Sequence, residues 1–209
     1  MKFNQVREVV FYGDSFFIFY KKLSPQAKLK VDWTLQLIES LPLVPEKFLK
    51  HLSGTDGLYE IRIAYESNAY RLLCFFDEGK LMVVLNGFHK KTNRTPNSEI
   101  NSKTAVLAAT IMEKNKITSL REHLDQEYGV AETASRASYE EGFEAFQLGY
   151  FLQELRAREG WTQEELAKRC GTTKSYISRI ENNASDIRLS TILRIFREGF
   201  GKQVHFVIT

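Results

Sequence analysis

The chain has 209 residues, of which 43% are hydrophobic and 12% aromatic, enough for one large or two small buried cores. It contains no apolar run of the roughly 18 residues that a membrane span needs, and its N-terminus lacks the layout of a signal peptide, so we expect a cytoplasmic protein with no membrane partner. Cys74 and Cys170 lie in apolar patterns, and we expect buried thiols rather than a disulfide or a metal site.

The net charge of +3 is unevenly distributed along the chain. Residues 1–116 hold 17 basic and 12 acidic side chains, residues 117–147 hold 2 and 7, and residues 148–209 hold 10 and 7. Two basic segments favour polyanionic partners, and the acidic segment between them either covers one of them or is a hydrated connector. The pattern predicts an N-terminal domain, an acidic helical connector and a C-terminal domain with these boundaries.

Hydrophobic periodicity predicts an α+β fold for residues 1–116. Pro25 opens a helical stretch whose apolar positions fall on one face up to Ser40, and short loops join three strands after residue 57. In chain order we expect a strand, a helix, three strands and a helix, which make a small antiparallel sheet with helices: residues 6–12, 24–40, 58–65, 70–76, 81–88 and 97–114.

Several basic side chains gather on the predicted sheet. Side chains alternate along a strand, so Glu60 and Arg62 share one face, and Arg71 lies on the neighbouring strand. The third strand ends in His89, Lys90 and Lys91. Two arginines bordered by lysines are typical of a phosphate-binding surface. The alternative is that Arg62 merely pairs with Glu60 and that the lysines are solvated.

The blocks GLYEIRI, YR, FF and GFHKKTNRTP follow one another between residues 57 and 96. In order and spacing they resemble the RelE/HigB superfamily of bacterial toxins, and the resemblance covers nearly all of residues 1–116. It implies a fold similar to microbial ribonucleases and cleavage of mRNA on the ribosome. It also implies that Arg62, Arg71, Lys90 and Lys91 stand at functional positions.

Such cleavage is possible without a metal, because the 2′-hydroxyl of RNA can attack the adjacent phosphate. The protein must position the groups, move two protons and stabilise an anionic phosphorus. We expect Arg62 and Arg71 to stabilise that charge, and Lys90, Lys91 or His89 to carry the protons, although His89 is otherwise a rim residue. We find no carboxylate pair typical of a two-metal nuclease and no glycine-rich nucleotide loop, so we predict no metal and no cofactor.

The C-terminal segment is predicted to be helical. Leu148, Leu152 and Leu155 recur at helical spacing before Gly160, and Thr162 with Glu165 forms a capping box. The pattern predicts further helices at 163–170 and 174–182, a helix that carries Leu189, Ile192, Leu193 and Phe196, and a strand at 202–208 that needs a partner strand.

Two short helices joined by a tight turn have the geometry that enters a major groove. The segment WTQEELAKRCGTTKSYISRIENN resembles the Xre-type (Cro/repressor-like) helix-turn-helix family, although the family usually has Gly at Asn183 and Pro near Ile187. The resemblance implies DNA binding, with contacts to base edges and phosphates from Gln163, Thr173, Lys174, Ser175, Tyr176, Ser178 and Arg179.

Residues 117–209 as a whole resemble a HigA-type antitoxin, which usually follows its toxin as a separate protein. Here both lie in one chain, so the antitoxin is present at a fixed ratio and high effective concentration. We therefore predict a latent mRNA endonuclease that is neutralised in cis by an autorepressor, with operator DNA, ribosome-bound mRNA and a second subunit as partners. The alternative is a DNA-binding regulator whose N-terminal domain has lost catalysis and serves assembly.

Overall fold

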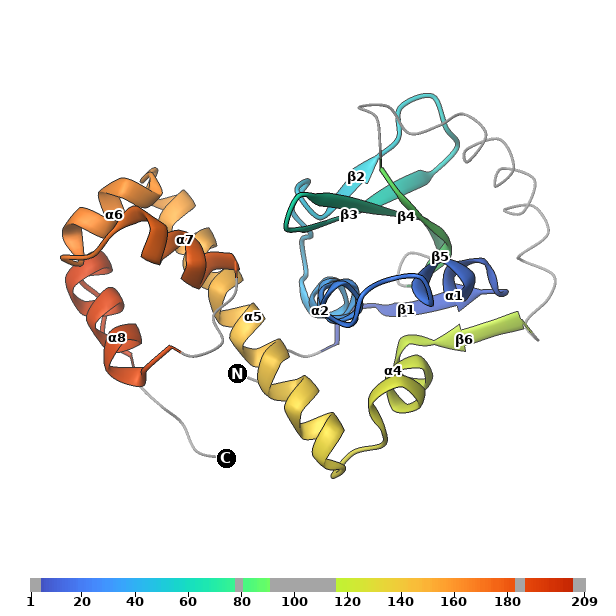
Figure 1. The fold of residues 1–209 in the computed structure, drawn as a ribbon. Coiled ribbons are helices and arrows are strands. Elements are labelled where there is room, and N and C mark those ends of the chain that lie inside the picture. Colours follow the sequence, from blue (N-terminus) through green and yellow to red (C-terminus); the bar gives the residue numbers. More distant parts are fainter. Residues whose placement is uncertain (1–4, 78–80, 91–115, 183–186, 205–209) are drawn as a thin grey trace. The chain divides into compact units, whose positions relative to one another are not determined.

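The computed structural model describes residues 5–77, 81–90, 116–182 and 187–204. The chain forms two compact units, Met1–Arg136 and Ala137–Thr209, and each is described by itself (Figure 1). Within the described ranges, no helix combines the length and the apolar character needed to cross a membrane.

A mixed sheet of six strands is the centre of the N-terminal unit, in the order β2-β3-β4-β5-β1-β6 (Figure 1). The α+β prediction is confirmed, with the correction that β1 pairs parallel with β5, while all other neighbours are antiparallel. The reason is that the chain crosses from β1 to the far edge of the sheet before the β3-β4-β5 meander returns to β1. The strands are β1 Glu8–Tyr12, β2 Leu49–His51, β3 Leu58–Tyr65, β4 Asn68–Asp77, β5 Leu81–His89 and β6 Ile117–Ser119.

Helices α1 (Ser15–Tyr20) and α2 (Pro25–Ser40) pack on this sheet, α1 mainly against β5 and α2 against β1 and β3. Helix α2 begins as predicted, with Pro25 in its first turn. Helix α1 was not predicted, because SFFIFY is apolar almost throughout and shows no helical period. It lies close to β5, since a Cβ added at Gly87 would lie 2.1 Å from the Phe19 ring. The predicted helix 97–114 lies outside the described residues.

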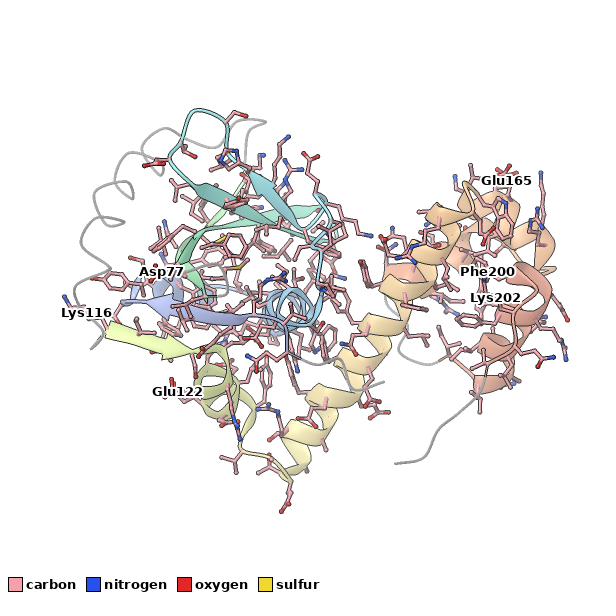
Figure 2. The ribbon with its side chains drawn as sticks, turned by 180° about the vertical axis from the view of Figure 1, so that it is seen from behind. Asp77, Lys116, Glu122, Glu165, Phe200 and Lys202 are labelled. Atoms are coloured by element: carbon pink, nitrogen blue, oxygen red, sulfur yellow. The ribbon has the colours of Figure 1, made fainter. Side chains whose placement is uncertain are left out.

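Two further elements after residue 116 complete the N-terminal unit. Strand β6 pairs with β1, and helix α4 (Leu120–Tyr128) follows it directly. Ser119 and Glu122 form a capping box at the start of α4, and Figure 2 labels Glu122 on this helix. The charge pattern predicts an acidic helical connector at residues 117–147, and the compact N-terminal unit extends to Arg136. We call residues 117–128 the arm.

A buried carboxylate joins the arm to α2. Asp32 is fully buried and accepts hydrogen bonds from the hydroxyls of Tyr20 and Tyr128, the latter at 2.7 Å. Its other oxygen lies 3.0 Å from Nε2 of His123, which is also buried. Burial, followed by the Asp32 charge, raises the pKa of both tyrosines, so they remain donors. A salt bridge of 2.6 Å between Lys28 and Glu127 lies at the rim.

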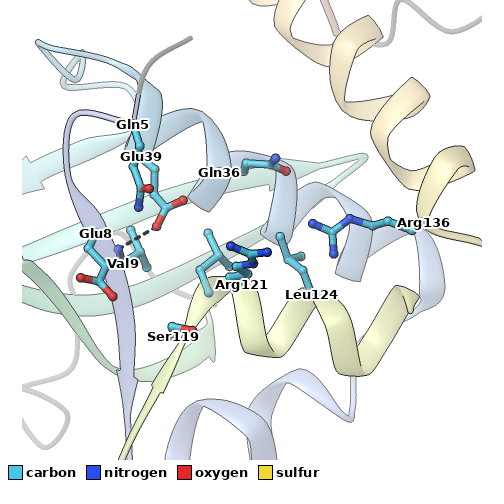
Figure 3. Close-up of a pocket in the computed structure, with 10 residues that line it drawn as sticks. Gln5, Glu8, Val9, Gln36, Glu39, Ser119, Arg121, Leu124 and Arg136 are labelled. Carbon is cyan, nitrogen blue, oxygen red and sulfur yellow. Dashed lines mark hydrogen bonds between the residues drawn. The ribbon is translucent and has the colours of Figure 1, made fainter. Parts of the chain in front are cut away.

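A pocket of about 430 Å³ lies between β1, α2 and the arm (Figure 3). On its wall, Glu39 accepts a hydrogen bond of 2.8 Å from the backbone N–H of Val9. Burial raises the pKa of Glu39 to about 7; the hydrogen bond from Val9 opposes the shift and the charge of Glu8 adds to it. The folded protein therefore keeps a proton on Glu39 at pH values where the unfolded chain has lost it.

We expect the substitution Glu39→Gln to flatten the dependence of stability on pH. Because the pKa is raised in the folded state, the wild-type protein loses stability as the pH rises from about 4.5 to about 7, and the loss is complete above that range. Relative to wild type, the free energy of unfolding of the variant should rise by roughly 2–3 kcal/mol from pH 5 to pH 8, measured by urea unfolding at both values. An equal difference at the two pH values would contradict this assignment.

The C-terminal unit is helical, as predicted, and consists of helices, a π-helical turn and short loops. The predicted third helix, α7, has the expected bounds, and the capping box of Thr162 and Glu165 is present at the start of α6. Of the predicted strand 202–208, residues 202–204 have no regular secondary structure and the rest lies outside the described residues. The elements are α5 Ala134–Arg158, α6 Gln163–Arg169, α7 Lys174–Asn182, α8 Leu189–Arg194 and the turn η2 Ile195–Gly199.

The C-terminal core is small and tightly packed. Leu166, Ile177 and Ile180 are buried together with Cys170, and Trp161 packs against them. Cys170 and Cys74 are both buried free thiols, as predicted, and burial raises the pKa of each. This core holds α6 and α7 at the close approach that a helix-turn-helix requires.

Candidate nucleic-acid interfaces

The structure brings three of the predicted cationic residues together on one face of the N-terminal sheet. Arg62 on β3 and Arg71 on β4 are direct cross-strand partners, and Arg71 pairs with Phe88 on β5. Lys90 lies two residues beyond Phe88 and therefore on the same face; its backbone N–H donates to the carbonyl of Ala69 at 2.7 Å. We call Arg62, Arg71 and Lys90 the cation cluster.

The carboxylate of Glu60 lies at the centre of the cation cluster. Its Oε1 accepts hydrogen bonds from Nε of Arg62 at 3.2 Å and Nε of Arg71 at 3.1 Å, and Nζ of Lys90 lies 3.9 Å away. The pairing of Arg62 with Glu60 that the sequence left open is therefore present, and the other two cations share it. One carboxylate against three cations leaves an excess of positive charge, which suits an anionic ligand.

The other two predicted catalytic residues do not join the cluster in the described structure. His89 is exposed and pairs with Tyr70, with ring centroids 5.3 Å apart. Because neighbouring residues on a strand point to opposite faces, its ring lies on the face away from Arg71 and Lys90. Lys91 lies outside the described residues. Of these two residues, Lys90 therefore lies on the face that carries the arginines, and His89 does not.

The arm lies away from the cation cluster. The sheet order places β5 and β1 between β4, which carries Arg71, and β6. Helix α4 mainly contacts β1, β6 and α2. In the described part of the N-terminal unit, the arm therefore does not cover the two arginines.

In the C-terminal unit, α7 presents a polar surface. Lys174, Ser175 and Arg179 are exposed, as DNA contacts require. They line a shallow groove with three further residues, of which Asn182 was not predicted: Gln163, Ser178 and Asn182. Asn182 donates to the carbonyl of Ser178 at 2.8 Å, and its place on the third turn of α7 could have indicated this role.

Two of the predicted DNA contacts also have structural roles. The hydroxyl of Thr173 accepts from the backbone N–H of Tyr176 at 3.2 Å and so caps α7, as expected from its position. Tyr176 is half-buried against the C-terminal core, and the guanidinium of Arg179 lies 5.0 Å from the centre of its ring. That contact orients Arg179 along the surface of the helix.

A buried ion pair connects the groove to the helices behind it. Both oxygens of Glu181 accept from Arg156 on α5, at 2.5 and 2.8 Å, and Arg156 also donates to the carbonyl of Trp161 at 2.7 Å. The side-chain amide of Gln163 donates to Glu181 at 2.8 Å. The hydrogen bond with Glu181 is the main cause that raises the pKa of Arg156, so this guanidinium stays charged. The pair fixes the start of α6 to the end of α7.

Two segments of the chain match known protein families. Residues 19–106 match a family described as phage-derived protein Gp49-like (DUF891), and residues 152–198 match a helix-turn-helix family. The antitoxin HipB of Escherichia coli K12 is 35% identical over 60 residues, which are 29% of this chain and 68% of HipB. HipB of E. coli O6:H1 is 34% identical over 65 residues, 31% of this chain and 69% of HipB. Through its helix-turn-helix, the chain belongs to the HipB antitoxin family.

The HipB-like segment is only one part of the chain. A hypothetical transcription factor of Neisseria meningitidis serogroup B is 42% identical over 45 residues, and the chain spans 42% of that relative's length. The N-terminal part is a Gp49-like domain, of the RelE/HigB-like toxin family. A toxin-like domain is thus fused to a HipB-like DNA-binding domain in one polypeptide. The narrower assignment of the second part as HigA-type stays a prediction.

Proposed function

We propose that the chain is a toxin and its antitoxin in one polypeptide: a latent, metal-independent endonuclease for ribosome-bound mRNA, neutralised in cis, with a C-terminal domain that represses its own operator. The observation that supports the enzymatic part is the convergence of Arg62, Arg71 and Lys90 on one face of the sheet. A Gp49-like domain without such a cluster would favour a role in assembly alone.

The cation cluster suits phosphoryl chemistry on RNA. When the 2′-hydroxyl attacks, negative charge grows on the phosphate oxygens, and two neighbouring guanidiniums can stabilise it with oriented donors. We assign Lys90, which lies on the face of the arginines, as the donor of a proton to the departing 5′-oxygen. The proton of the attacking 2′-hydroxyl goes to neutral Lys91, or alternatively to His89. No step in this scheme requires a metal.

Neutralisation in cis is supported by the arm, which packs on β1 and α2 of the toxin-like unit. The arm lies at the β6 edge of the sheet, and β5 and β1 separate it from β4, which carries Arg71. We therefore infer that the arm prevents the toxin-like unit from docking on the ribosome and does not cover the cleavage site. The groove along α7 supports binding to a palindromic operator by a homodimer in the cytoplasm.

Bacterial growth tests this proposal. We expect residues 1–116 to arrest growth when they are induced, whereas residues 1–136, which keep the arm, and the full chain do not. The substitutions Arg62→Ala and Arg71→Ala together should abolish the arrest caused by residues 1–116, because both donors to the phosphate are removed. Colony counts and culture density after induction provide the measurement.

Immunoblots of the soluble fraction are the control, since residues 1–116 lack β6 and α4. Arrest by residues 1–136 would assign neutralisation to the C-terminal unit instead of the arm. Normal growth with all three chains, each soluble, would favour the alternative of a DNA-binding regulator with an inactive toxin-like domain.

A further inference from the structure

The carboxylate of Glu60 is buried beneath the cation cluster that it joins. The side chain of Glu60 is 2% exposed, against 29% for Arg62 and 14% for both Arg71 and Lys90. We propose that Glu60 is a positioning residue of the RNA site: it binds the Nε edges of both arginines and thereby directs their outer Nη atoms toward a phosphate. This inference rests on the proposed function of the cation cluster.

The strand register shows why such a residue is needed. Arg62 and Arg71 are direct cross-strand partners, so their Cβ atoms lie about 4.5–5.5 Å apart, and like charges placed opposite each other in this way are destabilising. An anion between them removes the repulsion. Glu60 supplies it from the same strand face, two residues before Arg62, and both Nε atoms donate to the same oxygen.

The hydrogen bonds also fix how each guanidinium is oriented. Arg71 is held at a second point, because its Nη1 donates to the carbonyl of Tyr70 at 2.7 Å. A guanidinium presents its donors as a planar fork, so anchoring Nε fixes the plane of the remaining donors. Both forks are thereby oriented before an RNA phosphate arrives, which lowers the entropy lost on binding.

The burial of Glu60 indicates that it positions other groups and does not contact the RNA itself. A carboxylate that is 2% exposed and lies under three cations is kept from the substrate by the groups that it binds. A phosphate would also repel it. Glu60 therefore acts through Arg62 and Arg71, and its removal should alter their geometry rather than take away a group that touches RNA.

A binding experiment on the full chain distinguishes positioning from simple charge masking. Substitution of Glu60 should weaken RNA binding in the first case and strengthen it in the second. The probe is a fluorescein-labelled single-stranded RNA with 2′-O-methyl groups, which cannot be cleaved by its own 2′-oxygen, and anisotropy gives its Kd. All proteins carry Lys174→Ala and Arg179→Ala, so that the α7 groove contributes little. The variants are Glu60→Ala, Glu60→Gln and Arg62→Ala/Arg71→Ala.

If Glu60 positions the arginines, Glu60→Ala should weaken RNA binding by roughly fivefold or more, because two rotamer-rich side chains must be ordered on binding. Glu60→Gln keeps an acceptor oxygen and should lie between Glu60→Ala and the parent. If Glu60 only masks charge, both variants should bind RNA more tightly. The slope of the logarithm of the binding constant against the logarithm of the salt concentration should then be steeper by about 0.7. Tighter or unchanged binding by both variants overturns the inference.

Two further measurements keep the outcomes distinct. Thermal unfolding identifies a Glu60→Ala protein that has lost its fold, in which case the Glu60→Gln variant decides, together with the arginine Nε–H resonances in NMR spectra. Those resonances should exchange faster with solvent in Glu60→Gln than in the parent. If Arg62→Ala/Arg71→Ala binds RNA as well as the parent, the proposed RNA site itself fails. If that double variant loses binding while no folded Glu60 variant binds RNA more weakly than the parent, only the positioning role fails.

Discussion

Replacing Asp32 by alanine is expected to lower the free energy of unfolding of the N-terminal unit by roughly 3 kcal/mol or more, because buried Tyr20 and His123 and half-buried Tyr128 would lose the acceptor that they share. The substitution removes the group that joins α2 to α4. It should therefore detach the arm before the rest of the sheet unfolds. Urea unfolding measures the loss, and hydrogen exchange shows whether α4 amides lose protection first.

Lys28→Ala is the matched control for this prediction, since it also removes a contact between α2 and α4. Lys28 and Glu127 are 22% and 31% exposed, so their salt bridge is worth about 0–1 kcal/mol. Equal effects of the two substitutions would show that the buried carboxylate adds nothing beyond a surface contact. A protected α4 in the Asp32→Ala protein would show that β6 and the apolar contacts of Leu120 and Leu124 hold the arm.

Replacing Glu181 by alanine should destabilise the C-terminal unit by about 3–5 kcal/mol, because the charge of Arg156 remains in place without its buried partner. Gln163 also loses its acceptor, so the start of α6 is no longer fixed to α7. We expect a lower midpoint of unfolding and weaker binding to DNA from the region upstream of the gene, measured by denaturation and by mobility shift.

The double substitution Arg156→Met/Glu181→Leu tests the cause. When both charges are replaced by apolar side chains of similar volume, most of the stability should return. Arg179→Ala is the second control, because Arg179 is exposed: it should weaken DNA binding and leave the unfolding midpoint nearly unchanged. If the double variant is no more stable than Glu181→Ala, the unpaired charge of Arg156 is not the cause of the loss.

Local patterns predicted much of this fold. The alternation in LYEIRIAY placed β3 at its observed bounds, and capping residues placed α2, α6 and α7. Short elements were missed because they carry too few residues to show a period. Strand β2 and strand β6 have three residues each, and they form only because a neighbouring strand offers its edge.

The candidate sites also contain some features that local sequence patterns predict and others that they do not. The shared face of Glu60 and Arg62 follows from alternation, and α7 follows from helical spacing. By contrast, the approach of His123 to Asp32 joins residues 91 positions apart, and no local pattern encodes it. The predicted boundary after residue 116 rests on the charge pattern and on the extent of the family resemblance. Charge reports the surface of α4, whereas its buried Leu120, His123 and Leu124 decide where it packs.

The pairing of β6 with β1 has a consequence for synthesis of the protein. The toxin-like sheet can form up to β5 before the arm has been made, and 27 residues separate the end of β5 from the start of β6. At about 5–20 residues per second, translation delivers β6 within roughly 1–5 seconds of β5. A separate antitoxin must be translated, fold and diffuse to its target. In this chain, each newly made toxin-like domain meets its own arm while the ribosome is still attached.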